Sequence, residues 1–164
     1  RGAGDVYCVG TRKTCMDVAA KYGATDFLSY KNGDLAGQIL ERTQGKGVDK
    51  VVVAGGTTDT FDAAIRMVKP GGIIANVNYL GEGDFVKIPR AEWGCGMAHK
   101  QIRGGLMPGG RLRTERLLRL IETKRVDPSL LLTHKFYGFS HVEQALYLMK
   151  DKTSDLIKPV VYLA

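Results

Sequence analysis

Short apolar runs alternate with helical patterns over about the first 100 residues, and this alternation most constrains the fold. The runs are nearly continuous in apolar residues, as buried parallel strands are, and lack the strict alternation of a half-exposed strand. Strands are predicted at residues 6–9, 26–30, 48–54 and 73–77. Helices are predicted at residues 15–22, 34–44 and 59–68. This order predicts an α/β fold, with a doubly wound parallel sheet covered by helices on both faces.

Two local signals set predicted boundaries in this region. Asp34 is a residue type that accepts hydrogen bonds from the first turn of a helix, so we expect it to cap the helix that follows. The sequence Lys69-Pro70-Gly71-Gly72 is expected to close the next helix before the strand at residues 73–77 begins.

The turn after the first predicted strand carries the most informative polar residues. In doubly wound sheets the ligand binds at the carboxyl ends of the strands. NAD-binding domains place Asp or Glu after their second strand, which the strand at residues 6–9 would be if another strand precedes it. Here the turn is Gly10-Thr11-Arg12, with no carboxylate. Gly10 leaves room for a phosphate, and the guanidinium of Arg12 suits a phosphate dianion. The turn therefore predicts selection of NADP, and an ordinary polar turn is the alternative.

The glycine-rich fingerprint of a dinucleotide site is missing, because no G-x-G-x-x-G follows a predicted strand. We therefore expect the first strand of a Rossmann-like sheet and its glycine-rich turn to lie upstream of Arg1. That strand is central in the order 3-2-1-4-5-6, so its loss leaves a gap of about 4.8 Å on each side. We expect the isolated chain to be unstable or inactive unless another segment fills the gap.

The pattern changes after residue 100, and the chain is expected to leave the first domain at a glycine-rich loop that spans residues 104–110. Residues 1–106 are assigned to an incomplete NADP-binding Rossmann domain, and residues 107–164 to a separate C-terminal segment. Three elements are predicted in that segment: a helix with an apolar stripe at Leu112, Leu117, Leu118 and Ile121, a helix from a capping box at Ser140 and Glu143 through Met149, and a strand at 160–163.

The charge is uneven: the net charge is +7, and residues 100–125 hold eight basic and two acidic residues. This segment is interpreted either as a solvated helix face or as a contact with phosphate or an acidic partner. Nucleic acid is not expected as a partner, because the basic run lacks interleaved aromatic residues. A membrane is not expected either, because no run approaches the ~20 apolar residues that a span needs. An odd number of cysteines, Cys8, Cys15 and Cys95, indicates a reducing compartment, and we expect a cytoplasmic protein.

Several longer strings resemble the zinc-type medium-chain dehydrogenases, in particular their NADP-dependent secondary alcohol dehydrogenases. The strings that carry this resemblance are Gly10-Thr11-Arg12, VVAGG at 52–56, VKPGG at 68–72, ANVNY at 75–79, PRAEWGCGMAHK at 89–100, and KDK at 150–152 with LIKPV at 156–160. The resemblance covers essentially the whole chain and corresponds to the second half of a subunit about twice as long. It implies that residues 107–164 return to the catalytic domain of the parent protein.

The resemblance also implies roles for particular residues. Gly10, Thr11, Arg12 and Tyr30 would surround the adenosine 2′-phosphate of NADP. Many members of the family carry Ser at the position of Thr11, and the hydroxyl is retained here. Val77, Asn78 and Tyr79 would line the nicotinamide end, and Lys152 would reach the cofactor from the returning segment; a surface lysine is the alternative for Lys152.

For the parent protein the resemblance implies reversible hydride transfer between NADP(H) and a secondary alcohol or ketone, a catalytic zinc, and a tetramer. The zinc ligands of the family lie in the N-terminal half, so no catalytic and no metal-binding residue is assigned in this sequence. A non-catalytic fragment that acts only in folding, assembly or partner binding is the alternative. Cys95 and His99, four residues apart, could share one face of a helix and contribute two ligands to a metal site. A buried thiol beside a hydrogen-bonded histidine is the other interpretation of that pair.

Overall fold

The computed structural model describes residues 2–163, and by its internal contacts the chain divides into two compact units. The first comprises the described part of Arg1–Lys31 together with Gly109–Ala164, and the second comprises Asn32–Pro108. Every strand pairing among the described residues is parallel, so the predicted α/β class with parallel strands is confirmed. None of the described helices is both long and apolar enough to cross a membrane.

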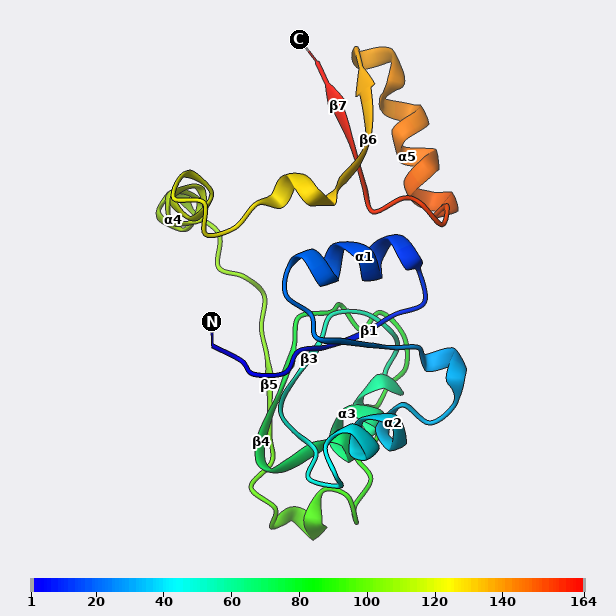
Figure 1. The fold of residues 1–164 in the computed structure, drawn as a ribbon, viewed down its shortest axis with the longest axis vertical. Helices are drawn as coiled ribbons and strands as arrows, with labels where there is room; N and C mark the ends of the chain where they lie inside the picture. The colour runs from blue at the N-terminus through cyan, green and yellow to red at the C-terminus, as the bar shows by residue number, and fades with distance from the viewer. Residues whose placement is uncertain (1, 164) are drawn as a thin grey trace. The chain divides into compact units, whose positions relative to one another are not determined.

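The first unit contains two short parallel sheets, which Figure 1 shows in blue and in yellow to red. Its elements are β1 (Tyr7–Val9), α1 (Lys13–Lys21), β2 (Asp26–Leu28), α4 (Arg111–Glu122), β6 (Leu132–Tyr137), α5 (Val142–Asp151) and β7 (Lys158–Tyr162). Strand β1 pairs with β2, and β6 pairs with β7. Helix α5 packs along β7, where Ala145 is buried on the helix.

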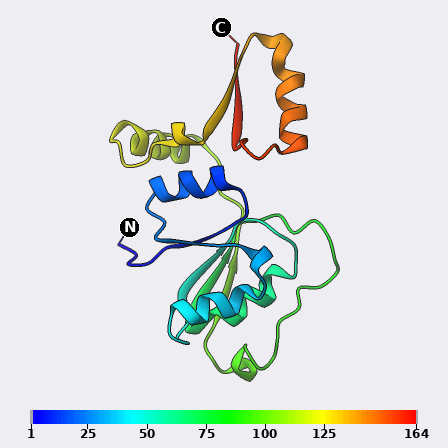
Figure 2. The same cartoon turned by 45° about the vertical axis from the view of Figure 1, so that its right-hand side comes forward.

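The second unit contains the main core. Its elements are α2 (Leu35–Arg42), β3 (Val48–Val53), α3 (Thr60–Met67), β4 (Val68–Asn76) and β5 (Gln101–Gly104). The strands form one sheet in the order β3-β4-β5, and α3 packs on β3 and β4 while α2 packs on α3 (Figures 1 and 2). Phe61, Ala64 and Ile65 lie at helical spacing on α3 and are buried. They pack against Val53 on β3 and against Val68 and Ile74 on β4.

The strand order matches the prediction of a doubly wound sheet without its first strand. Strands β1 and β2 form one sheet, and β3, β4 and β5 form another. In the order 3-2-1-4-5-6, removal of strand 1 leaves the pair 3-2 and the trio 4-5-6. The structure contains that pair and that trio as separate parallel sheets.

Four details of the sequence prediction are wrong. Strand β4 begins at Val68 and not at residue 73: Val68 pairs with Val48, and Ile73 pairs with Lys50, so the Lys-Pro-Gly-Gly sequence lies in a bulge inside the strand. Ser140 does not form the predicted capping box, because it lies in a 3₁₀ turn at Phe139–His141. Helix α5 starts at Val142, and no side chain of the described residues caps it. Strands β5 and β6 were not predicted.

Asp34 does cap α2, because its carboxylate accepts a hydrogen bond from the amide of Ala36 at 3.1 Å. We expect Asp34→Ala to destabilise α2 by about 1 kcal/mol, the usual cost of losing such a cap. Asp59→Ala is the matched control, since Asp59 precedes α3 and makes no capping hydrogen bond within the described chain. Hydrogen exchange of the α2 and α3 amides measures both effects. Equal losses in the two helices would contradict the capping role.

Candidate functional site

The turn after β1 is held to the neighbouring strand and is open to a ligand. The amide of Gly10 donates to the carbonyl of Leu28 at 3.0 Å, which fixes the start of the turn beside β2. A Cβ atom built on Gly10 would have no heavy atom within 4 Å. There is therefore free space directly above this turn, at the carboxyl end of a parallel strand where ligands bind in such folds.

The polar side chains at this turn have partners elsewhere in the first unit. The hydroxyl oxygens of Thr11 and Tyr30 lie 3.3 Å apart, and Tyr30 begins a 3₁₀ turn two residues after the end of β2. Arg12 donates from Nη1 to the carbonyl of Leu156 at 2.5 Å. A guanidinium has five N–H donors, so one bond to a carbonyl leaves capacity for a bidentate contact with a phosphate. The structure thus places Tyr30 beside Thr11, and Gly10 and Arg12 are the chain neighbours of Thr11 in the same turn.

Lys152 belongs to the same unit and occupies an unusual backbone position. It ends α5 in the left-handed conformation, with φ 51° and ψ 55°, and its side chain is exposed. Two residues further on, the carbonyl of Ser154 accepts a hydrogen bond from Thr14 Oγ1 at 3.1 Å. The segment that carries Lys152 is therefore tied to the start of α1, immediately after the turn at residues 10–12.

The second group of predicted residues follows β4 in the second unit. The amide of Val77 donates to the carbonyl of Val53 at 2.9 Å, and Asn78 Nδ2 donates to the carbonyl of Gly56 at 3.0 Å. Asn76 donates from Nδ2 to the carbonyl of Asn78, and its Oδ1 accepts from the amide of Asn78. Val77 and Tyr79 remain exposed, at 64% and 90%. The segment is thus fixed by its asparagines while two side chains face outward.

The surface has a hollow of about 390 Å³ and another of about 330 Å³. Of these two, the smaller lies at the ends of strands. The smaller is lined by Ala75, Asn76, Val77, Arg103, Gly104, Gly105, Leu106 and Met107. It sits where β4 and β5 end, the position that the fold predicts for a ligand. Asn76 and Arg103 were not among the predicted site residues. Asn76 stood in a predicted strand, and β5 was not predicted at all.

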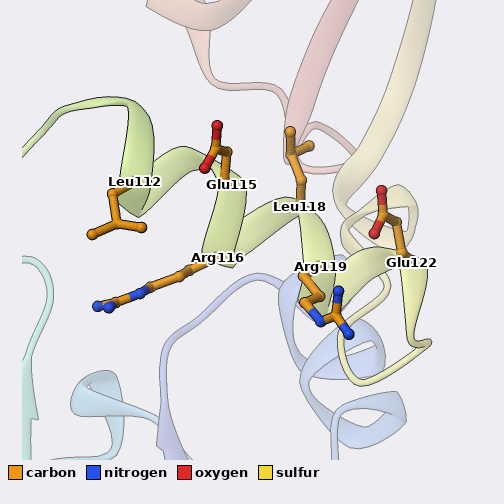
Figure 3. A pocket seen from close by; sticks show the side chains of 6 residues that line it. All are labelled: Leu112, Glu115, Arg116, Leu118, Arg119 and Glu122. Atoms are coloured by element: carbon orange, nitrogen blue, oxygen red, sulfur yellow. The ribbon is translucent and has the colours of Figure 1, made fainter.

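The larger hollow belongs to α4 alone. Its lining residues are Leu112, Glu115, Arg116, Leu118, Arg119 and Glu122, and all project from successive turns of one helix (Figure 3). No residue of α4 is buried, and Arg111 pairs with Glu115 at 2.6 Å. The depression is therefore a groove between exposed side chains of one helix and is a weak candidate for a small-molecule site.

Lys100, the first basic residue of the charged segment, has a different role. Its Nζ donates to the carbonyl of Ile65 near the end of α3, at 2.7 Å. Burial lowers the pKa of Lys100 from its ordinary value, and the charge of Glu92 opposes that shift. An ammonium at the C-terminal end of a helix interacts favourably with the helix dipole, so this residue is part of the packing of the second unit.

The described residues contain no group of three or more His, Cys, Asp or Glu side chains able to hold a metal ion. Cys95 and His99 do not share a helical face, because Cys95 lies in a 3₁₀ turn at Gly94–Gly96 and both residues have positive φ, 53° and 54°. The alternative of a buried thiol is wrong as well, because Cys95 is exposed. Arg90 Nη1 donates to its sulfur at 3.1 Å.

Comparison with known proteins connects this arrangement to a family. Residues 1–123 match the family of zinc-binding dehydrogenases. The chain belongs to this family. The resemblance inferred from the sequence strings is confirmed at this level.

Two curated relatives are identical to this dehydrogenase chain at 60% or more of the aligned residues. The NADP-dependent isopropanol dehydrogenase of Thermoanaerobacter brockii is 60% identical over 164 residues, which is 100% of this chain and 47% of that protein. The enzyme of the same name from Entamoeba histolytica is 61% identical over 160 residues, 98% of this chain and 44% of that protein. The chain therefore spans about half the length of the curated relatives it matches.

Solved structures agree on the fold. Benzyl alcohol dehydrogenase from Acinetobacter calcoaceticus superposes with a TM-score of 0.83 at 21% identity, over 99% of this chain and 44% of that one. A 2R,3R-butanediol dehydrogenase from Bacillus subtilis gives a TM-score of 0.80 at 22% identity, over 99% and 45%. At this level of identity the likeness concerns the fold alone.

Proposed function

We propose that this chain is the cofactor-binding portion of an oxidoreductase that reversibly transfers a hydride between NADP(H) and a secondary alcohol or ketone. The observation that carries the proposal is the group of Thr11, Arg12 and Tyr30 at the carboxyl end of β1, with no carboxylate in the turn. The names of the two relatives, both at 60% identity or more, support NADP as the cofactor and isopropanol as a model substrate.

The turn residues are proposed to recognise the 2′-phosphate of NADP. The open space over Gly10 accommodates the phosphate, and the hydroxyls of Thr11 and Tyr30 donate to its oxygens. Arg12 supplies a planar cation with parallel N–H donors. A carboxylate in this turn would repel the phosphate dianion. NAD lacks the 2′-phosphate, so it gains no ionic contact with Arg12.

The segment after β4 is proposed to border the nicotinamide end of the cofactor. Val77 and Tyr79 offer exposed apolar surface, and Asn78 is fixed by its bond to Gly56. Lys152 is proposed to contact the cofactor from the end of α5. We also retain the division at residues 106 and 107 between an incomplete cofactor domain and a segment of the catalytic domain.

Zinc is proposed to bind ligands in the N-terminal half of the parent protein, as the resemblance implies. In such enzymes a zinc ion polarises the alcohol oxygen and lowers its pKa. The contribution of this chain is to bind and orient the cofactor. We further propose a cytoplasmic tetramer that binds neither membrane nor nucleic acid; three unpaired thiols support a reducing compartment.

The protein expressed from its complete coding region should oxidise propan-2-ol with NADP. We expect kcat/KM to be at least about 100-fold higher with NADP than with NAD, because only NADP gains charge-assisted bonds to Arg12. Removal of metal with a chelator should abolish turnover while NADP binding persists, and added Zn²⁺ should restore it. Equal use of NAD would contradict the cofactor assignment. Binding of NADP without turnover by the metal-loaded protein would instead favour the non-catalytic alternative.

A further inference from the structure

The loop between α5 and β7 is bonded to the start of α1 at two points. We call residues 152–157 the return loop. Arg12 Nη1 donates to the carbonyl of Leu156 at 2.5 Å, and Thr14 Oγ1 donates to the carbonyl of Ser154 at 3.1 Å. These partners lie 144 and 140 positions apart in the sequence, so the bonds join two distant parts of the same compact unit.

The return loop is held from its other side as well. The amide of Ile157 donates to Thr133 Oγ1 on β6 at 2.9 Å, and the amide of Leu156 donates to the carbonyl of Thr153 at 3.1 Å. Leu156 is 3% exposed, so its side chain anchors the loop in the unit. The position of the Leu156 carbonyl is therefore set by packing on one side and by the Thr14 bond on the other.

This arrangement controls the guanidinium of Arg12. A long flexible side chain loses conformational freedom when it binds a ligand, unless its orientation is already fixed. The Leu156 carbonyl holds one nitrogen of Arg12 before any ligand arrives. The geometry of that carbonyl in turn depends on Ser154, two residues earlier, which Thr14 holds.

We propose that Thr14 is a positioning residue for recognition of the cofactor 2′-phosphate, acting through the return loop and Arg12. The proposal rests on the NADP function proposed above. Thr14 does not touch the phosphate itself. Its hydroxyl fixes Ser154, the loop then places the carbonyl of Leu156, and that carbonyl fixes one nitrogen of Arg12, two residues after Gly10.

The test measures binding of adenosine 2′,5′-bisphosphate and of adenosine 5′-monophosphate to the full-length protein by calorimetry. Thr14→Val removes the hydroxyl at nearly constant volume and should weaken the bisphosphate about three- to tenfold, the range expected when one long side chain loses its fixed orientation. Affinity for the monophosphate should not change. Thr14→Ser retains the hydroxyl and should restore bisphosphate affinity to within about twofold. Thr123→Val is the control, because among the described residues that hydroxyl bonds its own helix, at the carbonyls of Arg119 and Leu120.

Hydrogen exchange separates the loop effect from general damage. In Thr14→Val the amides of Leu156 and Ile157 should exchange faster, with no change in α2 of the other unit. If the unmodified protein does not prefer the bisphosphate, the NADP proposal fails. If it does prefer the bisphosphate but Thr14→Val binds it equally well, or weakens both nucleotides alike, the role of Thr14 is overturned and the NADP proposal stands.

Discussion

Arg12→Gln is expected to lower the affinity of the full-length protein for NADP by about 100-fold, because the variant loses charge-assisted bonds each worth about 1.5–3 kcal/mol. Affinity for NAD should remain within about threefold, since NAD has no 2′-phosphate. The glutamine amide ends at the position of Arg12 Nε, two bonds short of the Nη1 that donates to Leu156, so in this variant the return loop depends on its bonds to Thr14 and Thr133. Titration of both cofactors, followed by fluorescence or calorimetry, measures the two affinities directly.

Lys13→Gln is the matched control. It removes one positive charge from the adjacent residue, but the ammonium of Lys13 is already paired with Asp17, at 2.8 and 2.7 Å to its two oxygens. An exposed ion pair of this kind is screened by solvent, so its loss should have little effect on a phosphate bound nearby. NADP affinity should therefore fall less than about threefold, a change that screening by salt would reduce further.

Arg12→Lys gives a graded test of geometry. Lysine keeps the charge but loses the planar fork, so we expect NADP affinity between that of the unmodified protein and that of Arg12→Gln. If Arg12→Gln bound NADP and NAD with unchanged affinities, the 2′-phosphate would have to be recognised elsewhere. If both affinities fell together, Arg12 would serve the structure of the turn and not the choice of cofactor.

The order of elements could be predicted because buried parallel strands and amphipathic helices leave strong local patterns. Phe61, Ala64 and Ile65 recur at helical spacing and form the buried face of α3. Strand β5 escaped prediction because its four residues are exposed in the structure and include the charged Arg103, so no apolar run marks it. The start of β4 at Val68 was missed because Pro70 and Gly71 are residue types that usually end an element, and here they lie in a bulge.

Only the part of the candidate site that depends on local sequence could be predicted. Thr11 and Arg12 follow an apolar run, so their position at the end of β1 was visible in the sequence. The bonds that Arg12 and Thr14 make to the return loop depend on tertiary folding over more than a hundred residues, and no local pattern encodes them. The capping box at Ser140 was wrong because α5 starts one residue later than predicted: His141, and not Ser140, occupies the N-cap position, after a 3₁₀ turn at Phe139–His141.

Gly47→Ala is expected to destabilise the second unit by about 3 kcal/mol. Gly47 precedes β3 with φ 75°, a conformation that costs an L-residue about 1–2 kcal/mol. A Cβ atom there would also lie 2.6 Å from the carbonyl oxygen of Met67 and 3.1 Å from the amide nitrogen of Lys69. Both neighbours are backbone atoms where α3 gives way to β4, and overpacking of this kind costs about 1–3 kcal/mol more.

Gly45→Ala separates the two contributions. Gly45 has nearly the same backbone conformation, with φ 78°, but a Cβ atom there would meet nothing within 4 Å. Its substitution should cost only the conformational part, about 1–2 kcal/mol. The slowest-exchanging amides of β4 report the free energy of opening this unit in the full-length protein.

The difference between the two variants tests how firmly β3 is packed against the junction of α3 and β4. Val48, next to Gly47, pairs with Val68 at that junction, so a shift of the backbone at Gly47 must also move the first pair of the β3–β4 register. If Gly47→Ala and Gly45→Ala cost the same, the junction yields to the methyl group without loss. The close approach of Gly47 to Met67 would then not be a constraint on the register. A larger cost at Gly47 shows that this glycine is required by packing as well as by its backbone conformation.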